Sequence, residues 1–165
     1  MRRVVITGMG TVNALAKDVP GTFAAFREGR CGIGPLGFRD ADRLTIRIGA
    51  EIPDWQPEAR FAKSDLPLYD PVTQYALVAG DEAMAMAGLP GGLGPRGGVI
   101  LGTAAGGIST WEDSYRAVFA DGKNRVSPLV VPRLMLNASA SHLSIRYGLM
   151  GPVLAVSSAC ASANH

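Results

Sequence analysis

The sequence has 165 residues, of which 47% are hydrophobic and 18% charged, a composition typical of one globular domain that buries a core. Its net charge of +2 comes without a dense stripe of lysines and arginines, which argues against a nucleic-acid partner. The two cysteines, Cys31 and Cys160, form neither a CxxC motif nor a cluster with histidine, so neither a disulfide framework nor a metal site is expected.

The first expected element is a strand at residues 3–10, RVVITGMG, a short β-branched run that ends in glycines. This run is too short and too interrupted for a signal peptide. The uncharged stretch after Arg146 does not suit a bilayer either, because it is rich in glycine, proline, serine and asparagine and its apolar part is only VLAV. We therefore expect a cytoplasmic protein without a membrane-spanning segment.

Helix and strand patterns alternate through the first half of the chain. Residues 19–28 carry Val19, Phe23 and Phe26 at helical spacing, and residues 44–52, LTIRIGAEI, alternate as a strand does. Residues 53–71 contain prolines and scattered charges, which predicts an irregular segment. A helix over 72–87 is predicted by one apolar face, formed by Val72, Tyr75, Ala76, Ala79, Ala83, Met86 and Ala87.

The same alternation continues to the last residues. Residues 97–107, GGVILGTAAGG, predict a buried strand and a glycine-rich turn, and a helix with an apolar stripe is expected over 108–119. A basic loop at 122–132 precedes a helix from about 137 to 147, and VLAVSSA at 153–159 predicts a last strand. Strands that alternate with helices of this length predict an α/β fold, with helices packed on a mixed or parallel sheet, in one domain over 1–165.

Cys160 follows the last predicted strand and precedes a plausible helix, in VSSACASANH. By default a lone cysteine is a small buried apolar residue. At the first turn of a helix, however, a thiol faces unpaired backbone N–H groups and the positive end of the helix dipole, which favour the thiolate. The same N–H groups could bind a developing oxyanion, so Cys160 is a candidate nucleophile.

A base for this nucleophile is harder to find, because the chain has only two histidines. On a helix, His165 would be rotated about 140° away from Cys160. His142 lies on a different predicted helix, where a partly exposed helical residue is the simpler interpretation. The residues thus predict half a site, a nucleophile with an oxyanion donor but no group that handles the proton.

Several segments, in order, resemble the N-terminal half of the β-ketoacyl-acyl carrier protein synthases, the elongating, type II-like condensing enzymes of the thiolase fold. The resemblance covers nearly the whole chain, and the segments that carry it are RVVITGMG, YDPVTQYALVAGDEAMAMAGL, GVILGTAAGG, VSPLVVPRLMLNASASHLSIRYGLMGP and SSACASANH. The most specific part is the GP pair followed by a strand and ACAS. The resemblance implies the N-terminal half of a thiolase-like fold, ending within the helix after Cys160.

The resemblance also implies a chemistry. In that family the cysteine matching Cys160 takes an acyl group as a thioester, and its backbone N–H contributes to the oxyanion hole. Condensation with malonyl-acyl carrier protein, by decarboxylative Claisen chemistry in fatty acid or polyketide synthesis, uses two histidines and a lysine from the C-terminal half. The parent would be a cytoplasmic homodimeric acyltransferase without a cofactor, and the 165-residue chain alone is expected to be inactive in condensation.

Three further residues acquire roles through the resemblance. Ala105, in GTAAGG, matches a position where the family often carries a bulkier residue that gates the acyl pocket. Lys123 and Arg125 match a basic loop that helps to dock the acidic carrier protein. Considered without the resemblance, Ala105 is equally well a turn residue, and the two cations equally well belong to a solvated loop.

Two other functions remain open from the sequence. A dinucleotide-binding domain would also begin with a strand and glycines, but GMGTVN places Asn13 where the third glycine of GxGxxG is needed. A non-catalytic partner subunit that shapes the chain-length pocket would lack the nucleophile, whereas Cys160 stands in an intact ACAS. Two histidines and a lysine in further sequence would favour the enzyme.

Overall fold

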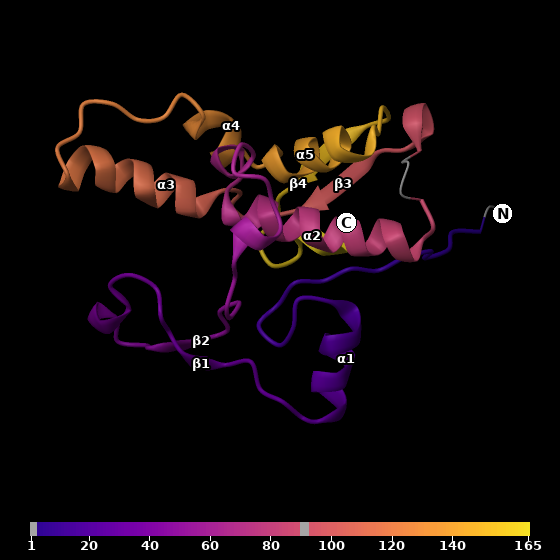
Figure 1. Ribbon diagram of the computed structural model, residues 1–165, viewed down its shortest axis with the longest axis horizontal. Helices are drawn as coiled ribbons and strands as arrows, with labels where there is room; N and C mark the ends of the chain where they lie inside the picture. The colour runs from indigo at the N-terminus through magenta and orange to yellow at the C-terminus, as the bar shows by residue number, and fades with distance from the viewer. Residues whose placement is uncertain (1–2, 90–92) are drawn as a thin grey trace. The chain divides into compact units, whose positions relative to one another are not determined.

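The computed structural model describes residues 3–89 and 93–165. It divides into two compact units, and we describe each by itself. The first comprises Met1–Gln56 with Val78–Ala87, and the second comprises Pro57–Leu77 with Gly88–His165. The helices and strands (Figure 1) are α1 Val19–Arg27, β1 Gly34–Pro35, β2 Ile48–Gly49, α2 Pro71–Met86, β3 Val99–Gly102, α3 Ile108–Tyr115, α4 Val130–Leu134, α5 Ala138–Tyr147 and β4 Val153–Val156.

Helix α1 confirms the helix predicted near residues 19–28. Asp18 caps its N-terminus by accepting a hydrogen bond from the Gly21 N–H at 2.7 Å, which satisfies one of the donors that a helix start leaves unpaired. The chain leaves the helix through Gly29, whose φ of +65° lies in the left-handed region. Local capping signals therefore fix both ends of α1.

The strand predicted at residues 3–10 is absent, and that prediction was wrong. The segment has no strand beside it, so Val4 and Ile6 stay 96% and 85% exposed. It instead runs along the second part of α2, where Thr11 N–H donates to Glu82 Oε2 at 3.0 Å. A Cβ on Gly8 would collide with the Ala83 carbonyl. The β-branched run lacks the neighbouring strand that a ladder requires.

The strand predicted at residues 44–52 is also largely wrong. Only Ile48–Gly49 forms β2, which pairs antiparallel with β1 and places Gly34 opposite Gly49. Ile46 and Ile48 are 70% and 62% exposed, so the alternating pattern has no core to face. The irregular segment expected after it, by contrast, contains only short 3₁₀ turns at Pro57–Ala59 and Leu66–Leu68 before α2 begins.

The second unit is built on the parallel strand pair β3–β4, whose register aligns Val99 with Val153 and Gly102 with Val156. Parallel strands need a long crossover connection, and here α3, α4 and α5 lie between them in the chain. Helix α5 contacts both strands and lies along them (Figure 1). The α/β prediction is confirmed, although β4 ends at Val156 rather than at residue 159.

Helix α2 has the predicted bounds within one residue, but its buried residues differ from the predicted face. Thr73, Gln74 and Leu77 are buried in the second unit, whereas the predicted alanines are only half-buried. Thr73 can be buried because its hydroxyl pairs with that of Ser139 on α5 at 2.9 Å. The buried face of α2 therefore includes a polar contact with α5, and the hydropathy of the α2 sequence does not indicate that face.

The predicted helix over 108–119 is present as α3 and a π-helical turn, Arg116–Ala120, and the chain turns at Gly122 with φ +65°. Its apolar stripe lies outside the core of the described chain. Trp111 stacks on Tyr115 at 5.7 Å and Tyr115 on Phe119 at 5.6 Å between ring centroids, while Phe119 is 77% exposed. These aromatic rings therefore pack against one another and lie outside the buried core.

The segment predicted as a loop over 122–132 already contains the start of α4. Pro132 fits there because the first turn of a helix needs no N–H at that position. Helix α5 covers Ala138–Tyr147, close to the predicted bounds, and is followed by Gly148 with φ +58°. Its Ala140 and Tyr147 are buried.

Candidate active site

Cys160 lies in a tight connection that leaves the C-terminal end of β4. The helix expected to carry it is instead a 3₁₀ turn, Ser162–Asn164, and Cys160 precedes this turn. Ala159 takes a left-handed conformation with φ +50°, which turns the chain sharply after the strand. Cys160 is thus displayed by a strained turn, and the interpretation as a buried apolar residue is wrong because its thiol is exposed.

Ser162 holds this connection together. Its side chain is buried, and its hydroxyl accepts a hydrogen bond from the Ser158 N–H at 2.9 Å and donates to the Ala159 carbonyl at 2.7 Å. The hydroxyl also lies 3.4 Å from the Thr103 carbonyl. One buried serine therefore ties both sides of the turn to the end of β3.

Gly102, the last residue of β3, lets the two segments approach. A Cβ at this position would stand 2.5 Å from the Ser162 carbonyl oxygen and 2.7 Å from the Ala163 nitrogen. Real Cβ atoms do not come this close to backbone, so only glycine fits without a shift. The glycine at the end of β3 is therefore needed for the close packing of these two segments.

The arrangement exposes the candidate nucleophile at the end of β4. Cys160 has an exposed thiol and pairs with Ser158 in an isolated parallel β-bridge, and the role of its backbone N–H as an oxyanion donor stays a prediction. Neither histidine forms a hydrogen bond with Cys160 in the described chain. His165 Nε2 lies 2.8 Å from Ser158 Oγ, and His142 packs edge-on against Tyr69 at 4.8 Å.

His142 predicts a pH-dependent stability. Its half-buried ring has a pKa below the ordinary 6.5 because burial disfavours the charged form. The unfolded chain then binds more protons between the two pKa values, so stability is complete above the unfolded pKa and is lost as pH falls through the folded one. We expect the free energy of unfolding to decrease from about pH 7.5 to about pH 5.5, measured by denaturant titration.

The matched variants are His142→Phe, which replaces the half-buried ring, and His165→Phe, which makes the same replacement at an exposed position. The first should flatten the pH dependence over this window, and the second should leave it as in the wild type. An unchanged slope in His142→Phe would contradict the assignment.

Ala105 lies on the turn between β3 and α3, next to the segment that carries Cys160. Ser157 Oγ lies 3.4 Å from the Ala104 carbonyl oxygen, and Thr103 N–H donates to the Val156 carbonyl at 3.0 Å. Ala105 itself is exposed. The structure thus brings the turn with Ala105 and the Cys160 connection to the same end of the strand pair.

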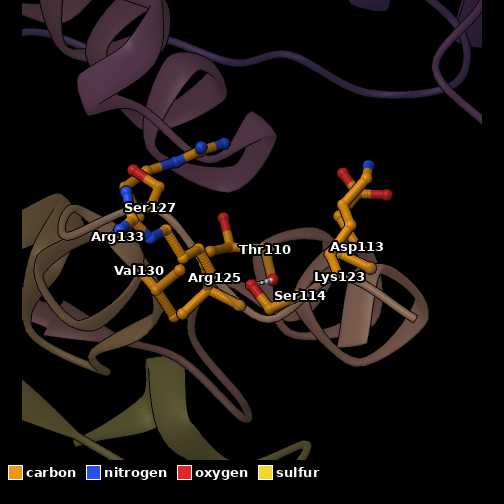
Figure 2. Close-up of a pocket in the computed structure, with 10 residues that line it drawn as sticks. Thr110, Asp113, Ser114, Lys123, Arg125, Ser127, Val130 and Arg133 are labelled. Carbon is orange, nitrogen blue, oxygen red and sulfur yellow. Dashed lines mark hydrogen bonds between the residues drawn. The ribbon is translucent and has the colours of Figure 1, made fainter. Parts of the chain in front are cut away.

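Lys123 and Arg125 lie elsewhere in the second unit, on the lining of a pocket of about 270 Å³. Figure 2 shows Lys123 beside Asp113 at one end of this pocket, and Ser127 and Arg133 at the other. Lys123 Nζ also lies 3.5 Å from Asp121 Oδ2, and both side chains are exposed. Of the charged side chains that line the pocket, Lys123, Arg125 and Arg133 are cations and Asp113 is a carboxylate, so the lining carries an excess of positive charge.

Sequence reasoning missed one functional candidate, Asp70. Its carboxylate is fully buried and accepts hydrogen bonds from Thr110 N–H at 2.8 Å and Thr110 Oγ1 at 2.7 Å. The pair Asp70–Pro71 at the start of α2 is a helix-start signal, which could have identified Asp70 as a cap. Nothing local, however, signals its contact with a residue on α3.

The sequence model described as "Beta-ketoacyl synthase, N-terminal domain" matches residues 1–165. The chain belongs to this family. As an N-terminal ketosynthase domain it resembles nodulation protein E of Rhizobium sp. (strain N33), with 42% identity over 99% of this chain and 41% of that protein. It also resembles the chloroplastic 3-oxoacyl-[acyl-carrier-protein] synthase I of Hordeum vulgare, with 32% identity over 99% of this chain and 37% of that protein.

Solved ketosynthase structures share the fold. The ishigamide ketosynthase/chain length factor superposes with a TM-score of 0.83 at 26% identity, over 94% of this chain and 40% of that one. A type II PKS acyl-carrier protein in complex with its ketosynthase gives a TM-score of 0.75 at 21% identity, over 98% of this chain and 43% of that one. This ketosynthase chain thus spans about two fifths of the length of its curated relatives.

The structure and the family assignment bear on two expectations from the sequence, the dinucleotide-binding alternative and the lack of a membrane-spanning segment. The dinucleotide-binding alternative fails, because residues 3–10 form no strand to precede a phosphate-binding turn and the chain belongs to the ketosynthase family. No helix in the described residues has the length and apolar character needed to cross a membrane. The roles of Cys160, Ala105, Lys123 and Arg125 remain predictions.

Proposed function

We propose that Cys160 accepts the acyl group in a 3-oxoacyl-acyl carrier protein synthase. The Cys160 thiolate attacks the carbonyl carbon of an acyl thioester, the carrier's thiolate leaves with the electron pair of the broken C–S bond, and a proton restores the carrier's thiol. Decarboxylation of malonyl-acyl carrier protein then releases CO₂ and leaves a carbanion, which attacks the acyl carbonyl carbon while the C–S bond to Cys160 breaks and Cys160 leaves as the thiolate. The observation that carries this proposal is the exposed thiol of Cys160, which follows the left-handed turn at Ala159 directly after β4.

The direct test is acylation of the chain. We expect incubation with an acyl-acyl carrier protein to add one acyl mass, and peptide mass spectrometry to place it on Cys160 as a hydroxylamine-sensitive thioester. A thioester on Cys31, which is exposed as well, would overturn the assignment. No acylation at any concentration of carrier would overturn the proposed nucleophile.

A second candidate is the non-catalytic partner subunit that shapes a chain-length pocket. This candidate is supported by the similarity of the chain to a structure described as a ketosynthase/chain length factor. Such a subunit would have the same fold and no acyl-cysteine. Acylation of Cys160 therefore separates the two functions in a single measurement.

The proposed partner is an acidic acyl carrier protein that docks at the pocket carrying Lys123 and Arg125. This proposal is supported by the excess of cations over carboxylates around that pocket and by the carrier protein named in the related synthase. Exposed charges of this kind attract an acidic partner through an interaction that salt screens, so they affect the binding of the carrier protein more than the acyl-transfer step. Within the same proposal, residues 1–165 form the N-terminal domain of a cytoplasmic homodimer, and the exposed Leu154 of β4 contributes to the dimer contact.

The double variant Lys123→Ala, Arg125→Ala tests the docking surface. We expect the apparent KM for acyl transfer from acyl-acyl carrier protein to rise about 3- to 10-fold at low salt, because each exposed charge contributes up to about 1 kcal/mol. The rise should shrink at high salt. Removing two exposed cations of the first unit, Arg27 and Arg43, gives a control with the same change in net charge. A fall in kcat at unchanged KM would contradict the docking role.

A further inference from the structure

Asp70 links the starts of two helices that are 40 residues apart in the chain. Its side chain is 1% exposed. The Oδ1 atom accepts from the Val72 N–H at 3.1 Å, in the first turn of α2, while Oδ2 accepts from both the N–H and the hydroxyl of Thr110, in the first turn of α3. A buried carboxylate with three donors is the kind of polar group that fixes one arrangement of its neighbours.

The turn that leads into α3 is wedged against this carboxylate. A Cβ on Gly107 would stand 3.0 Å from Asp70 Oδ2 and would collide with the Arg133 carbonyl. Gly106 has φ +67°, and a Cβ there would stand 2.7 Å from the Leu134 carbonyl. The Gly106–Gly107 pair is therefore confined between Asp70 and the end of α4.

The other end of the same turn is bonded to the Cys160 connection. Thr103 N–H donates to the Val156 carbonyl at 3.0 Å, and the Ser157 and Ser162 hydroxyls each lie 3.4 Å from a carbonyl oxygen of residues 103–104. Within the turn, Gly106 N–H donates to Thr103 Oγ1 at 3.3 Å. A continuous set of contacts therefore runs from Asp70 through residues 103–110 to residues 156–162.

We infer that Asp70 is a positioning residue for Cys160, acting through Thr110 and the turn at residues 103–107. Its bearing on catalysis rests on the proposed function of Cys160. Thr110 is 3% exposed, so water cannot readily replace the carboxylate as the acceptor for its N–H. Without that acceptor, the first turn of α3 and the glycine turn lose their shared anchor, and the Cys160 connection loses the surface to which it is bonded.

The experiment is amide hydrogen exchange on the 165-residue chain as wild type, Asp70→Asn and Thr110→Val. Asparagine keeps the shape but retains only one acceptor oxygen for the donors on Val72 and Thr110. Thr110→Val removes only the hydroxyl bond. Asp42→Asn, on an exposed residue of the first unit, is the control for the change in charge.

In Asp70→Asn we expect residues 103–110 and 156–162 to exchange about 10-fold faster, because losing a buried charge-assisted hydrogen bond lowers the cost of local opening. Residues 138–147 of α5 should exchange as in the wild type, and Thr110→Val should give a smaller change in the same two segments. Acceleration confined to the first turns of α2 and α3 would show a helix cap alone and overturn the inference. Equal acceleration throughout the second unit would also overturn it.

The same variants separate this inference from the proposed function. If the wild type is not acylated at Cys160, the proposed function fails whatever the exchange pattern is. If the wild type is acylated and both segments exchange as in the wild type when Asp70 is replaced, only the positioning role fails. Should Asp70→Asn not fold, Thr110→Val alone applies the same two-segment criterion.

Discussion

We expect the replacement of Cys160 with alanine to abolish the proposed acyl-thioester formation on this chain. The exposed thiol is the group proposed to attack the acyl carbonyl, and an alanine methyl has no lone pair with which to do so. We expect the acylated mass to be absent from Cys160→Ala after incubation with acyl-acyl carrier protein, under conditions in which the wild type is labelled. The measurement is intact-protein mass spectrometry over a time course.

The matched control for this variant is Cys31→Ala. Cys31 is exposed like Cys160 but lies in the first unit, where its sulfur accepts a hydrogen bond from the Ile33 N–H at 3.4 Å. Its replacement should leave the extent of acylation unchanged. Labelling that persists in Cys160→Ala and disappears in Cys31→Ala would reverse the assignment of the nucleophile.

Gly102→Ala destabilises the second unit and disorders the Cys160 connection. The new Cβ would stand 2.5 Å from the Ser162 carbonyl oxygen and 2.6 Å from its carbon. These are backbone atoms, which cannot rotate away as a side chain can. Overpacking of this kind costs about 1–3 kcal/mol of unfolding free energy, and we expect a loss in that range in denaturant titrations followed by Trp111 fluorescence.

Gly34→Ala is the control for adding one methyl group to a glycine. Gly34 also lies in a strand, but a Cβ there has nothing within 4 Å. Its unfolding free energy should stay within about 0.5 kcal/mol of the wild type. If Gly102→Ala were equally silent and fully acylated, the close approach of β3 to the Cys160 connection would not be needed for the site.

The helices of this chain could be predicted better than its strands. Helix α5 carries its own information, with apolar residues at helical spacing and Gly148 at its end, and such signals act between near neighbours in the chain. A strand is completed by another strand. The runs at 3–10 and 44–52 have suitable residues, but no partner lies beside most of their length, so the local pattern gave the wrong answer there.

The features of the candidate site likewise fall into two groups, those that the local sequence predicts and those that depend on distant segments. The exposure of Cys160 could be anticipated because β4, the small residues and the cysteine are consecutive in the sequence. The role of Ser162 is a buried hydrogen bond across a turn, and the contact between Asp70 and Thr110 joins positions far apart in the chain. Neither has a periodic signature, because a buried polar contact depends on which segments the fold brings together.

The left-handed backbone of Ala159 limits which residues this position can accept during evolution. A left-handed conformation costs a residue with a side chain about 1–2 kcal/mol relative to the right-handed one, and Ala159 has φ +50°. Glycine would remove that cost, and asparagine tolerates the conformation, whereas valine, isoleucine and threonine would bring a second branch at Cβ into the same crowded space. We therefore expect the position directly before Cys160 to accept only a few small or flexible residues.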